Sequence, residues 1–428
     1  MNTVTVRKKS YLKGEFTPPG DKSVSHRAVM LGSLAQGNTT VTNFCPGDDT
    51  LRTVNAFRSL GVIIEGTGTQ YTIAGKGLHG LHESSDVIDA GNSGTTARLI
   101  TGLLSGQDFF TTISGDGSLR SRPMRRVTKP LGEMGAKIDG RAKGDYLPLC
   151  IRGTLLSPLK YTLPVPSAQV KSAILLAGLY AEGVTEITEP LPSRDHTERM
   201  LAAMGGSVER HGAAIRVQGF PELKPLSFRI PGDVSSAAFL IVAATILPGS
   251  EVTIRKVGTN PLRSGILEVL QRMGAQIQII PSADEGGEPT ADIVVTSSSL
   301  KGVVINGEVI PRIIDEIPIL AVAAAHAEGT TIIRDAKELR VKETDRITAI
   351  VEGLKKFGVT AEEFDDGMAI TGQENLSGAT VPSYGDHRIA MAFIIAGLTA
   401  SGETTVQDTE VIGISFPQFM ETVGSLFT

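Results

Sequence analysis

The chain has 428 residues, of which 41% are hydrophobic and 20% are charged, so it can bury a large core and is too long for one domain of ordinary size. Its net charge of −5 and the lack of a basic tail argue against binding to nucleic acid, and its apolar runs are too short to span a membrane. Cys45 and Cys150 lie far apart with no second ligand at metal-binding spacing, so we expect a cytoplasmic protein without a zinc site or a disulfide.

Six segments repeat one pattern along the chain, and each reads as a small-residue apolar helix, a glycine and a short β-branched strand. In chain order the glycines are Gly37, Gly106, Gly183, Gly249, Gly329 and Gly402. A glycine at this point fits a left-handed cap at the end of the helix. Because the first helix of each unit is apolar almost all round, we expect it to be buried.

A second, more polar helix follows in each of the first five units and ends at another glycine before a strand. These glycines are Gly61, Gly135, Gly205, Gly274 and Gly358. The second helix is amphipathic and should cover the outside of its domain. Each unit then has the order β-α-β-α-β-β, which predicts an α/β fold. The units, which repeat at the spacing from Gly37 to Gly106, are longer than solenoid repeats. We therefore predict two domains of three units each.

Proline-rich stretches mark the expected boundaries. The segment from Pro221 to Pro231 lies between the third and fourth units, and Pro18 and Pro19 precede the first buried helix. We therefore predict an N-terminal domain of residues 20–228 and a C-terminal domain of residues 229–428 together with residues 1–19. The chain would cross between the domains twice, and its first strand would pair with the C-terminal half.

Five segments carry polar or charged residues at the start of a buried helix, where backbone N–H groups and the helix dipole favour anions. They read PGDKSVSHR, AGNSGTTAR, PSAQVKS, PGDVSSA and YGDHRIA. In the first, Lys22, Ser23 and Arg27 suit a phosphate or a carboxylate. The structural alternative is an ordinary N-cap formed by Asp21 or Ser23.

Two further segments, LRSRPMRR and ELRVKETDR, are denser in cations. Arg122 in the first precedes a proline that we expect to start a helix. In the second, Lys342 and Arg346 would share a face if the segment is helical, with Glu343 between them. The alternative for this segment is a solvated charged helix with local salt bridges.

Carboxylates also precede the fifth buried helix, in the segment DEIPIL. Asp315 and Glu316 there could serve as an N-cap or as a general base. His387 in YGDHRIA fits a structural role or a hydrogen-bond donor. Taken together, cations at the starts of several equivalent helices in an acidic protein indicate one shared anion site between two domains.

These strings resemble the EPSP synthase family of the shikimate pathway. The segments PGDKSVSHRA, GNSGTTAR, LRSRPM, PSAQVKSAILLAG, SRDHTERML, DEIPILAVAAA, LRVKETDR and YGDHRIAMAF occur in family order over nearly the whole chain. The resemblance implies a two-domain inside-out α/β barrel, in which each domain has three β-α-β-α-β-β units with buried helices and outer sheets. It implies transfer of the enolpyruvyl group of phosphoenolpyruvate to the 5-hydroxyl of shikimate 3-phosphate by addition and elimination, at a site between the domains.

The resemblance also assigns residues. Those matched to shikimate 3-phosphate are Lys22, Ser23, Arg27, Ser167, Ala168, Gln169, Arg194, Asp315 and Lys342. Those matched to phosphoenolpyruvate are Lys22, Gly94, Arg122, Gln169, Arg346 and Arg388, with Asp386 and His387 in support. Asp315 would take the hydroxyl proton, and Glu343 or Lys22 would supply the proton to the methylene carbon. The resemblance implies no metal or organic cofactor, no partner other than the two substrates, and a monomer.

Departures from the family pattern point to its second bacterial class. Ala168 stands where many members have Ser, Arg194 follows Ser193, and Ile414 stands where many have Lys, which puts one phosphoenolpyruvate contact in doubt. The nearest rival is the enolpyruvyl transferase acting on UDP-N-acetylglucosamine, which usually has a reactive Cys in the loop that reads GDGSLRSRPM here. No Cys lies between Cys45 and Cys150. A non-catalytic repeat protein that binds an anion is the other alternative.

Overall fold

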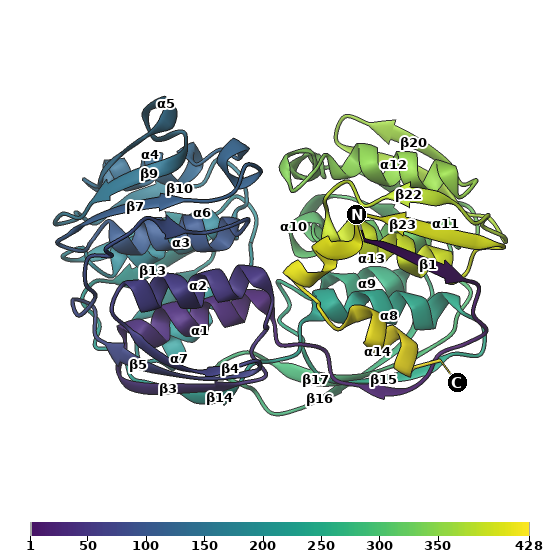
Figure 1. The fold of residues 1–428 in the computed structure, drawn as a ribbon, viewed down its shortest axis with the longest axis horizontal. Coiled ribbons are helices and arrows are strands. Elements are labelled where there is room, and N and C mark those ends of the chain that lie inside the picture. Colours follow the sequence, from purple (N-terminus) through teal and green to yellow (C-terminus); the bar gives the residue numbers. More distant parts are fainter. Residues whose placement is uncertain (1, 428) are drawn as a thin grey trace. The chain divides into compact units, whose positions relative to one another are not determined.

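The computed structural model describes residues 2–427, which form two compact units (Figure 1). Unit 2 contains Gly20–Pro231 and Asp284–Glu288, and unit 1 contains the rest of the chain. The chain therefore passes between units after Pro19, Pro231, Ala283 and Glu288, not only at the two crossings expected from the sequence. Residues 229–231 stay with unit 2 because the strand that ends at Arg229 pairs there and Asn43 Nδ2 donates to the carbonyl of Ile230.

Six inner helices form the centres of the two units. They are α1 (Lys22–Leu34), α3 (Gly94–Leu104) and α6 (Ala168–Gly178) in unit 2, and α8 (Val234–Ile246), α11 (Ile317–Ala325) and α13 (His387–Gly397) in unit 1. Small residues let these helices approach closely. A Cβ at Gly102 of α3 would lie 2.1 Å from the carbonyl oxygen of Ala173 in α6, so only glycine fits at this crossing.

A second set of helices is buried on one face only. It consists of α2 (Asp48–Ser59), α4 (Arg125–Glu133), α7 (His196–Ala203), α9 (Gly265–Arg272), α12 (Arg346–Lys356) and α14 (Phe419–Ser425). Two short helices, α5 (Arg141–Gly144) and α10 (Ile310–Ile313), complete the set of α-helices in residues 2–427. The first five outer helices end in the same two bonds. In α12, Val359 N donates to Leu354 O and Gly358 N to Lys355 O, with Gly358 at φ +83°, which is a Schellman cap.

The sequence predicted that the first glycine of each β-α-β-α-β-β repeat forms a left-handed cap at the end of the inner helix, and this was partly wrong. Gly106 has no positive φ, and Gly37 lies inside a strand and not at the end of α1. The remaining four glycines do have positive φ, but each lies two to four residues beyond the C-cap of its helix. Gly402, for example, lies beyond Leu398, the C-cap of α13. The left-handed cap belongs to the second helix because that helix turns straight into an antiparallel hairpin.

Each unit contains three sheets. In unit 2 the strand orders are β14 (Ser227–Arg229), β3 (Gln36–Thr42), β5 (Gln70–Lys76) and β4 (Ile63–Thr67); β6 (Ile88–Asp89), β7 (Phe110–Ser114), β9 (Tyr146–Arg152) and β8 (Lys137–Gly140); and β10 (Lys160–Thr162), β11 (Val184–Thr188), β13 (Ala214–Gln218) and β12 (Val208–His211). In unit 1 they are β16 (Gln276–Pro281), β17 (Thr290–Thr296), β15 (Glu251–Gly258) and β2 (Lys13–Phe16); β18 (Val304–Ile305), β19 (Thr330–Ile333), β21 (Gly367–Thr371) and β20 (Thr360–Phe364); and β1 (Thr3–Arg7), β23 (Glu403–Gln407) and β22 (Thr380–Pro382).

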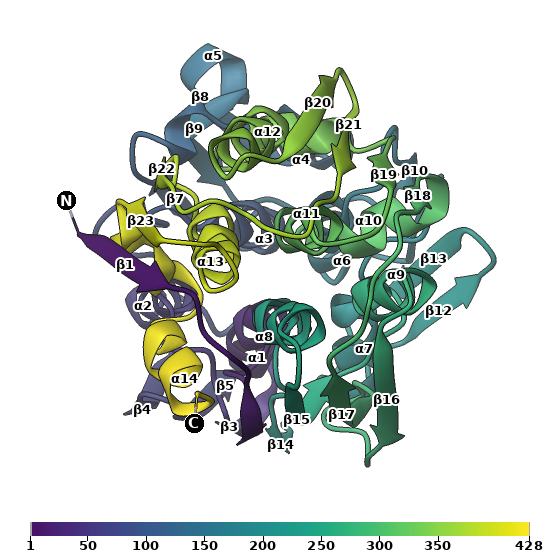
Figure 2. The same ribbon diagram turned by 90° about the vertical axis from the view of Figure 1, so that its right-hand side faces the viewer.

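Every sheet contains one parallel pair, and the strand that follows an inner helix is always a member of it, as in β6-α3-β7. A parallel pair needs a long crossover connection. An inner helix supplies it in four of the sheets, whereas β14 with β3 and β2 with β15 pair strands from distant parts of the chain. The N-terminal strands belong to unit 1, as the sequence predicts. β1 pairs antiparallel with β23 (Figure 2), and β2 pairs parallel with β15. The repeated β-α-β-α-β-β unit and the α/β fold are thus confirmed.

Each unit has its own hydrophobic core, built mainly from the inner helices and the inward faces of its sheets. Cys45 is buried and Cys150 is partly buried, and within residues 2–427 neither forms a disulfide. Within residues 2–427, no helix combines the length and the apolar character needed to cross a membrane.

Candidate active site

In unit 2 the starts of the inner helices gather the residues that the sequence singled out. Asp21, Ser93 and Ser167 are the N-caps of α1, α3 and α6, and each side chain accepts a backbone N–H of its helix. The structural alternative for Asp21 is therefore confirmed. Ser23 and Ala168 lie in the first turns of α1 and α6.

Two cations of α1 are already engaged by the protein. Lys22 Nζ donates to Asp49 Oδ2 of α2 at 2.6 Å. Arg27 is buried and donates through three different nitrogens, to Thr197 Oγ1, Ser23 O and Ser172 Oγ. Burial, together with the charge of Arg194, lowers the pKa of Arg27 to about 10, although Glu198 and Asp21 oppose this shift. Arg27 therefore ties α1 to α6 and α7 and lies within electrostatic reach of Arg194.

Gly94 lies where three polar side chains converge. A Cβ at this position would be 2.9 Å from Arg98 Nη1 and 3.7 Å from Arg122 Nη1. Arg98 Nη1 donates to Gln169 Oε1 at 2.5 Å, and Gln169 Nε2 donates to Thr95 Oγ1. The absence of a side chain at Gly94 thus lets two guanidinium groups lie close to the N-terminal end of α3.

Arg122 belongs to this group but differs from its expected setting. It follows a 3₁₀ turn (Leu119–Ser121), and α4 begins only at Arg125, so Pro123 does not start the helix. Its Nη2 donates to Asn92 Oδ1 at 2.6 Å and to Ser118 Oγ at 3.2 Å.

A buried lysine fixes the loop that carries Arg194. Lys171 Nζ, with a fully buried side chain, lies 3.0 Å from Glu189 Oε1 and 2.7 Å from Glu198 Oε1, and it donates to Ser193 O at 3.1 Å. Glu189 Oε2 accepts the backbone N–H and the hydroxyl of Ser193. Because Ser193 is bound through three of its groups, the position of the next residue, Arg194, is strongly restricted.

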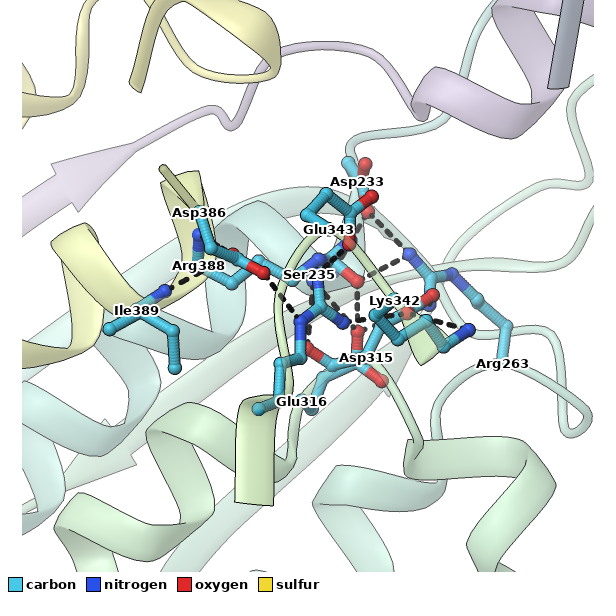
Figure 3. Close-up of polar contacts among 11 residues, drawn as sticks. Asp233, Ser235, Arg263, Asp315, Glu316, Lys342, Glu343, Asp386, Arg388 and Ile389 are labelled. Atoms are coloured by element: carbon cyan, nitrogen blue, oxygen red, sulfur yellow. Dashed lines mark hydrogen bonds and ion pairs between the residues drawn. The ribbon is translucent and has the colours of Figure 1, made fainter. Parts of the chain in front are cut away.

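In unit 1 the dominant feature is Arg346 at the start of α12, which is 1% exposed. Each of its nitrogens donates to a different carboxylate: Nε to Asp386 at 2.7 Å, Nη1 to Asp315 at 3.3 Å and Nη2 to Glu343 at 2.6 Å. Figure 3 labels these three carboxylate residues. Burial alone would lower the pKa of Arg346, but the three carboxylates together raise it far above its ordinary value. Arg346 is thus a permanent cation that joins three predicted site residues.

Lys342 also lies close to Asp315, although it does not share a helix face with Arg346 as the sequence suggested. The segment from Lys342 to Asp345 is not helical, since a 3₁₀ turn (Lys337–Val341) ends before it and Asp345 caps α12. Lys342 and Arg346 therefore do not share a helix face. They converge on Asp315 Oδ1, at 3.7 Å and 3.3 Å. The alternative of a solvated charged helix is wrong for Arg346, because that side chain is buried.

Arg388 and Glu316 form the second half of this network. Arg388 Nη1 donates to the backbone carbonyl of Asp315 at 3.0 Å and to Glu316 Oε1 at 3.4 Å. Glu316 is the N-cap residue of α11, as one alternative for this pair allowed, but its side chain makes no capping hydrogen bond. His387 is buried in the first turn of α13, beside Asp386, whose Oδ1 accepts the N–H of Arg388.

Comparison with known proteins identifies the family to which this geometry belongs. The family model of EPSP synthase (3-phosphoshikimate 1-carboxyvinyltransferase) matches residues 6–423. A 3-phosphoshikimate 1-carboxyvinyltransferase of Geobacter metallireducens is 55% identical over 419 residues, which cover 98% of each chain. The chain belongs to the EPSP synthase family. The family predicted from the sequence is thus confirmed.

Solved structures agree with this assignment. EPSP synthase from Acinetobacter baumannii has a TM-score of 0.90 and 45% identity, covering 99% of this chain and 98% of its own. The enolpyruvyl transferase NikO from Streptomyces tendae has a TM-score of 0.79 at 18% identity, covering 99% of this chain and 96% of its own, and so shares the fold. The two-domain inside-out α/β fold of the EPSP synthase family is therefore the fold of this chain.

Sequence reasoning missed Asp49 of unit 2 and Arg263 of unit 1, which complete the two clusters. It singled out the segments AGNSGTTAR and PGDVSSA but gave no role to Arg98 in the first or to Asp233 and Ser235 in the second. Arg98 lies four residues after Gly94, a spacing that could have indicated a shared helix face. Arg263 stands in the segment TNPLRSG, which carries no recognisable motif of the EPSP synthase family or of an anion site.

The structure also shows that the cations of unit 1 are not isolated. Arg263, Lys342, Arg346 and Arg388 lie among the carboxylates of Asp233, Asp315, Glu316, Glu343 and Asp386. With four cations and five carboxylates, the formal charge of this network is −1. Across residues 2–427, no group of three or more His, Cys, Asp and Glu side chains is arranged to bind a metal ion.

Proposed function

We propose that this chain transfers the enolpyruvyl group of phosphoenolpyruvate to the 5-hydroxyl of shikimate 3-phosphate and releases phosphate, a step of the shikimate pathway toward chorismate. Membership of the EPSP synthase family over residues 6–423 supports this activity. The structural observation that carries it is that Asp315 and Glu343 bind the same buried guanidinium of Arg346. Two carboxylates at one fixed cation suit a reaction with two proton transfers.

Shikimate 3-phosphate is proposed to bind mainly through unit 2. The proposed ligands are Lys22, Ser23, Arg27, Ser167, Ala168, Gln169 and Arg194, with Asp315 and Lys342 from unit 1. Support comes from the partly buried first turns of α1 and α6, whose N–H groups favour an anion, and from the fixed loop before Arg194. Arg27 has three of its five N–H groups bonded to the protein, so it can offer a ligand only the remaining two.

Phosphoenolpyruvate is proposed to bind through Arg346 and Arg388 of unit 1, with Lys22, Gly94, Arg122 and Gln169 of unit 2. Arginine matches carboxylate and phosphate groups through two parallel bonds. Asp386 and His387 have a supporting role. Asp386 accepts from Arg346 Nε and from the N–H of Arg388, so it links the two arginines that are proposed to bind this substrate.

The proposed chemistry is addition followed by elimination. Glu343 or Lys22 gives a proton to the methylene carbon of phosphoenolpyruvate, and the 5-hydroxyl oxygen attacks the adjacent carbon while Asp315 takes its proton. The tetrahedral intermediate then loses a proton from the new methyl group as its carbon–oxygen bond to phosphate breaks. The products are the enol ether and phosphate. Each proton transfer of this kind typically contributes about 10² to 10⁴ in rate.

Phosphate release from phosphoenolpyruvate tests this function. Purified protein is assayed in parallel with shikimate 3-phosphate and with UDP-N-acetylglucosamine as the acceptor. We expect release with the first acceptor only. Release with the second would move the chain to the sister enzyme. Binding of shikimate 3-phosphate without release would leave a binding protein and contradict the proposed reaction.

We further propose that the chain acts as a monomer in the cytoplasm. Its resemblance to biosynthetic enzymes of the family supports this, and the proposed ligands all come from one chain. Light scattering during size-exclusion chromatography should give the mass of a single chain with and without both substrates.

A further inference from the structure

Glu316 is a buried carboxylate to which neither the family resemblance nor the proposed reaction assigns a role. It is 1% exposed and lies between Asp315 and the start of α11. An ionised carboxylate without partners would be very costly at such a position, so the groups around it indicate what it does.

Within residues 2–427, one oxygen of Glu316 accepts all of its hydrogen bonds. Oε1 lies 3.1 Å from Arg263 Nη1 and 3.4 Å from Arg388 Nη1, and it accepts the hydroxyl of Ser235 (Figure 3). Arg263 is 3% exposed, donates to the Ser235 hydroxyl and lies 3.4 Å from Asp233. The buried charge of Glu316 is therefore matched by that of Arg263, while Arg388 reaches the same oxygen from α13.

The bonds of Arg388 determine which edge of its guanidinium can meet a ligand. Nη1 is occupied by Glu316 Oε1 and by the carbonyl oxygen of Asp315, and the side chain is 11% exposed. Among the residues that the structure describes, Nε and Nη2 show no hydrogen bond to the protein. Because the guanidinium is planar, two acceptors at Nη1 fix the plane and leave the opposite edge, Nε and Nη2, for a planar or tetrahedral anion.

We propose that Glu316, neutralised by Arg263, is a positioning residue that aims the free edge of Arg388 at the carboxylate or phosphate of phosphoenolpyruvate. This inference rests on the proposed function, in which Arg388 binds that substrate. Glu316 itself does not touch the substrate. It replaces the water that would otherwise bind Nη1, so Arg388 needs no reorientation when the anion arrives.

The test compares Glu316→Gln with Glu316→Gln/Arg263→Met. The single variant keeps the shape of the side chain but leaves Arg263 without its main counter-charge, so it should be less stable than the parent. The double variant removes both buried charges, and such a replacement is often neutral or stabilising. Glu403→Gln, which removes one partner of an exposed pair with Arg7, is the matched control and should change neither stability nor kinetics.

We expect the KM for phosphoenolpyruvate to rise about tenfold or more in both Glu316 variants, a loss of roughly one well-formed contact. The KM for shikimate 3-phosphate should stay within about twofold. The double variant should recover the thermal stability of the parent but not its KM for phosphoenolpyruvate. If the single variant does not fold, the double variant carries the test alone.

Two results would overturn the inference. One is an unchanged KM for phosphoenolpyruvate in the single variant, or in the double variant when only that one folds. The other is recovery of this KM in the double variant, which would mean that Glu316 only neutralises Arg263. These two results can be distinguished from a failure of the proposed function. If the proposed function fails, the unmodified protein itself releases no phosphate with shikimate 3-phosphate.

Discussion

Arg346 connects the residues on which the reaction is proposed to depend. Its three carboxylate partners come from different segments: Asp315 before α11, Glu343 before α12 and Asp386 before α13. Lysine could not replace it, because an ammonium group cannot present a planar fork to three separate acceptors. At the residue scale, then, the positions of Asp315 and Glu343, two of the three proposed acids and bases, depend on one guanidinium group.

The first residue-scale prediction concerns the proton donor. Glu343 Oε2 accepts from Arg346 Nη2 at 2.6 Å, and Gln can preserve that bond but cannot donate an acidic proton. If Glu343 is the acid, Glu343→Gln should lower kcat by about 10² to 10⁴ with little change in either KM. Lys22→Met should then mainly raise the KM for phosphoenolpyruvate. Steady-state kinetics distinguishes these outcomes, and near-normal turnover of Glu343→Gln with loss of turnover in Lys22→Met would make Lys22 the donor.

Gly94→Ala is the second residue-scale prediction. The new Cβ would lie 2.9 Å from Arg98 Nη1, which is the end of a flexible side chain, so we expect the fold to adjust with little loss of stability. Arg98 would have to move away from Gln169 and into the space before α3. The KM for phosphoenolpyruvate should rise by about tenfold, or roughly 1.4 kcal/mol. Gly132→Ala in α4, where nothing lies within 4 Å, is the control, and equal kinetics in the two variants would contradict this account.

At the scale of elements, the sequence predicted what is encoded locally. The order of helix, glycine and strand recurs in every β-α-β-α-β-β repeat, so the inner helices and their N-caps could be recognised from neighbouring residues alone. Contacts between distant segments could not be recognised in this way. Arg263 reaches Glu316 across 53 positions in the sequence, and Lys342, which precedes α12, lies 3.7 Å from Asp315. The sequence identified Asp315, Glu343 and Asp386 as site residues, but not that all three bind Arg346.

The element-scale prediction concerns the caps of the outer helices. Gly358 ends α12 at φ +83°, and the atom nearest to a Cβ added there, Gln373 Nε2, would be 3.7 Å away. Gly358→Ala therefore meets no steric clash, and its cost is the left-handed backbone conformation, about 1 to 2 kcal/mol. Gly424→Ala, inside α14 and with open space around it, should instead stabilise the protein by up to about 1 kcal/mol. Urea unfolding of both variants measures the difference, and equal effects would show that the cap does not depend on glycine.

At the scale of the whole molecule, the loop between β16 and β17 departs from the regular repeat. Its residues Asp284–Glu288 belong to unit 2, although both strands belong to unit 1. Glu288 Oε1 lies 2.8 Å from His196 Nδ1, and Arg199 Nη1 donates to the carbonyl of Gly287. A Cβ at Gly286 would be 2.5 Å from the ring of Phe228, so the tip fits closely. No local pattern predicts such a contact, because its two sides are 92 residues apart in sequence.

Each unit also contains one histidine that the fold keeps neutral. In unit 2, burial and the charges of Lys22 and Arg27 lower the pKa of His26 well below its usual 6.5. In unit 1, burial and Lys8 lower the pKa of His326 to about 4, and its Nε2 lies 2.9 Å from Thr399 Oγ1. In the unfolded chain both would bind a proton below pH 6.5. The free energy of unfolding should therefore fall as the pH decreases from about 6.5 toward 4.

For His326 the expected loss between pH 7 and pH 5 is about 2 kcal/mol, since the unfolded chain gains a proton that the folded chain does not. His326→Gln can keep a hydrogen bond to Thr399 and does not titrate, so its unfolding free energy should depend less on pH by about that amount. His211→Gln, at an exposed site on β12, should follow the parent. Urea unfolding at the two pH values measures this. Parallel pH profiles for His326→Gln and the parent would mean that His326 takes up a proton in the folded protein, and the neutral histidine of unit 1 would have to be abandoned.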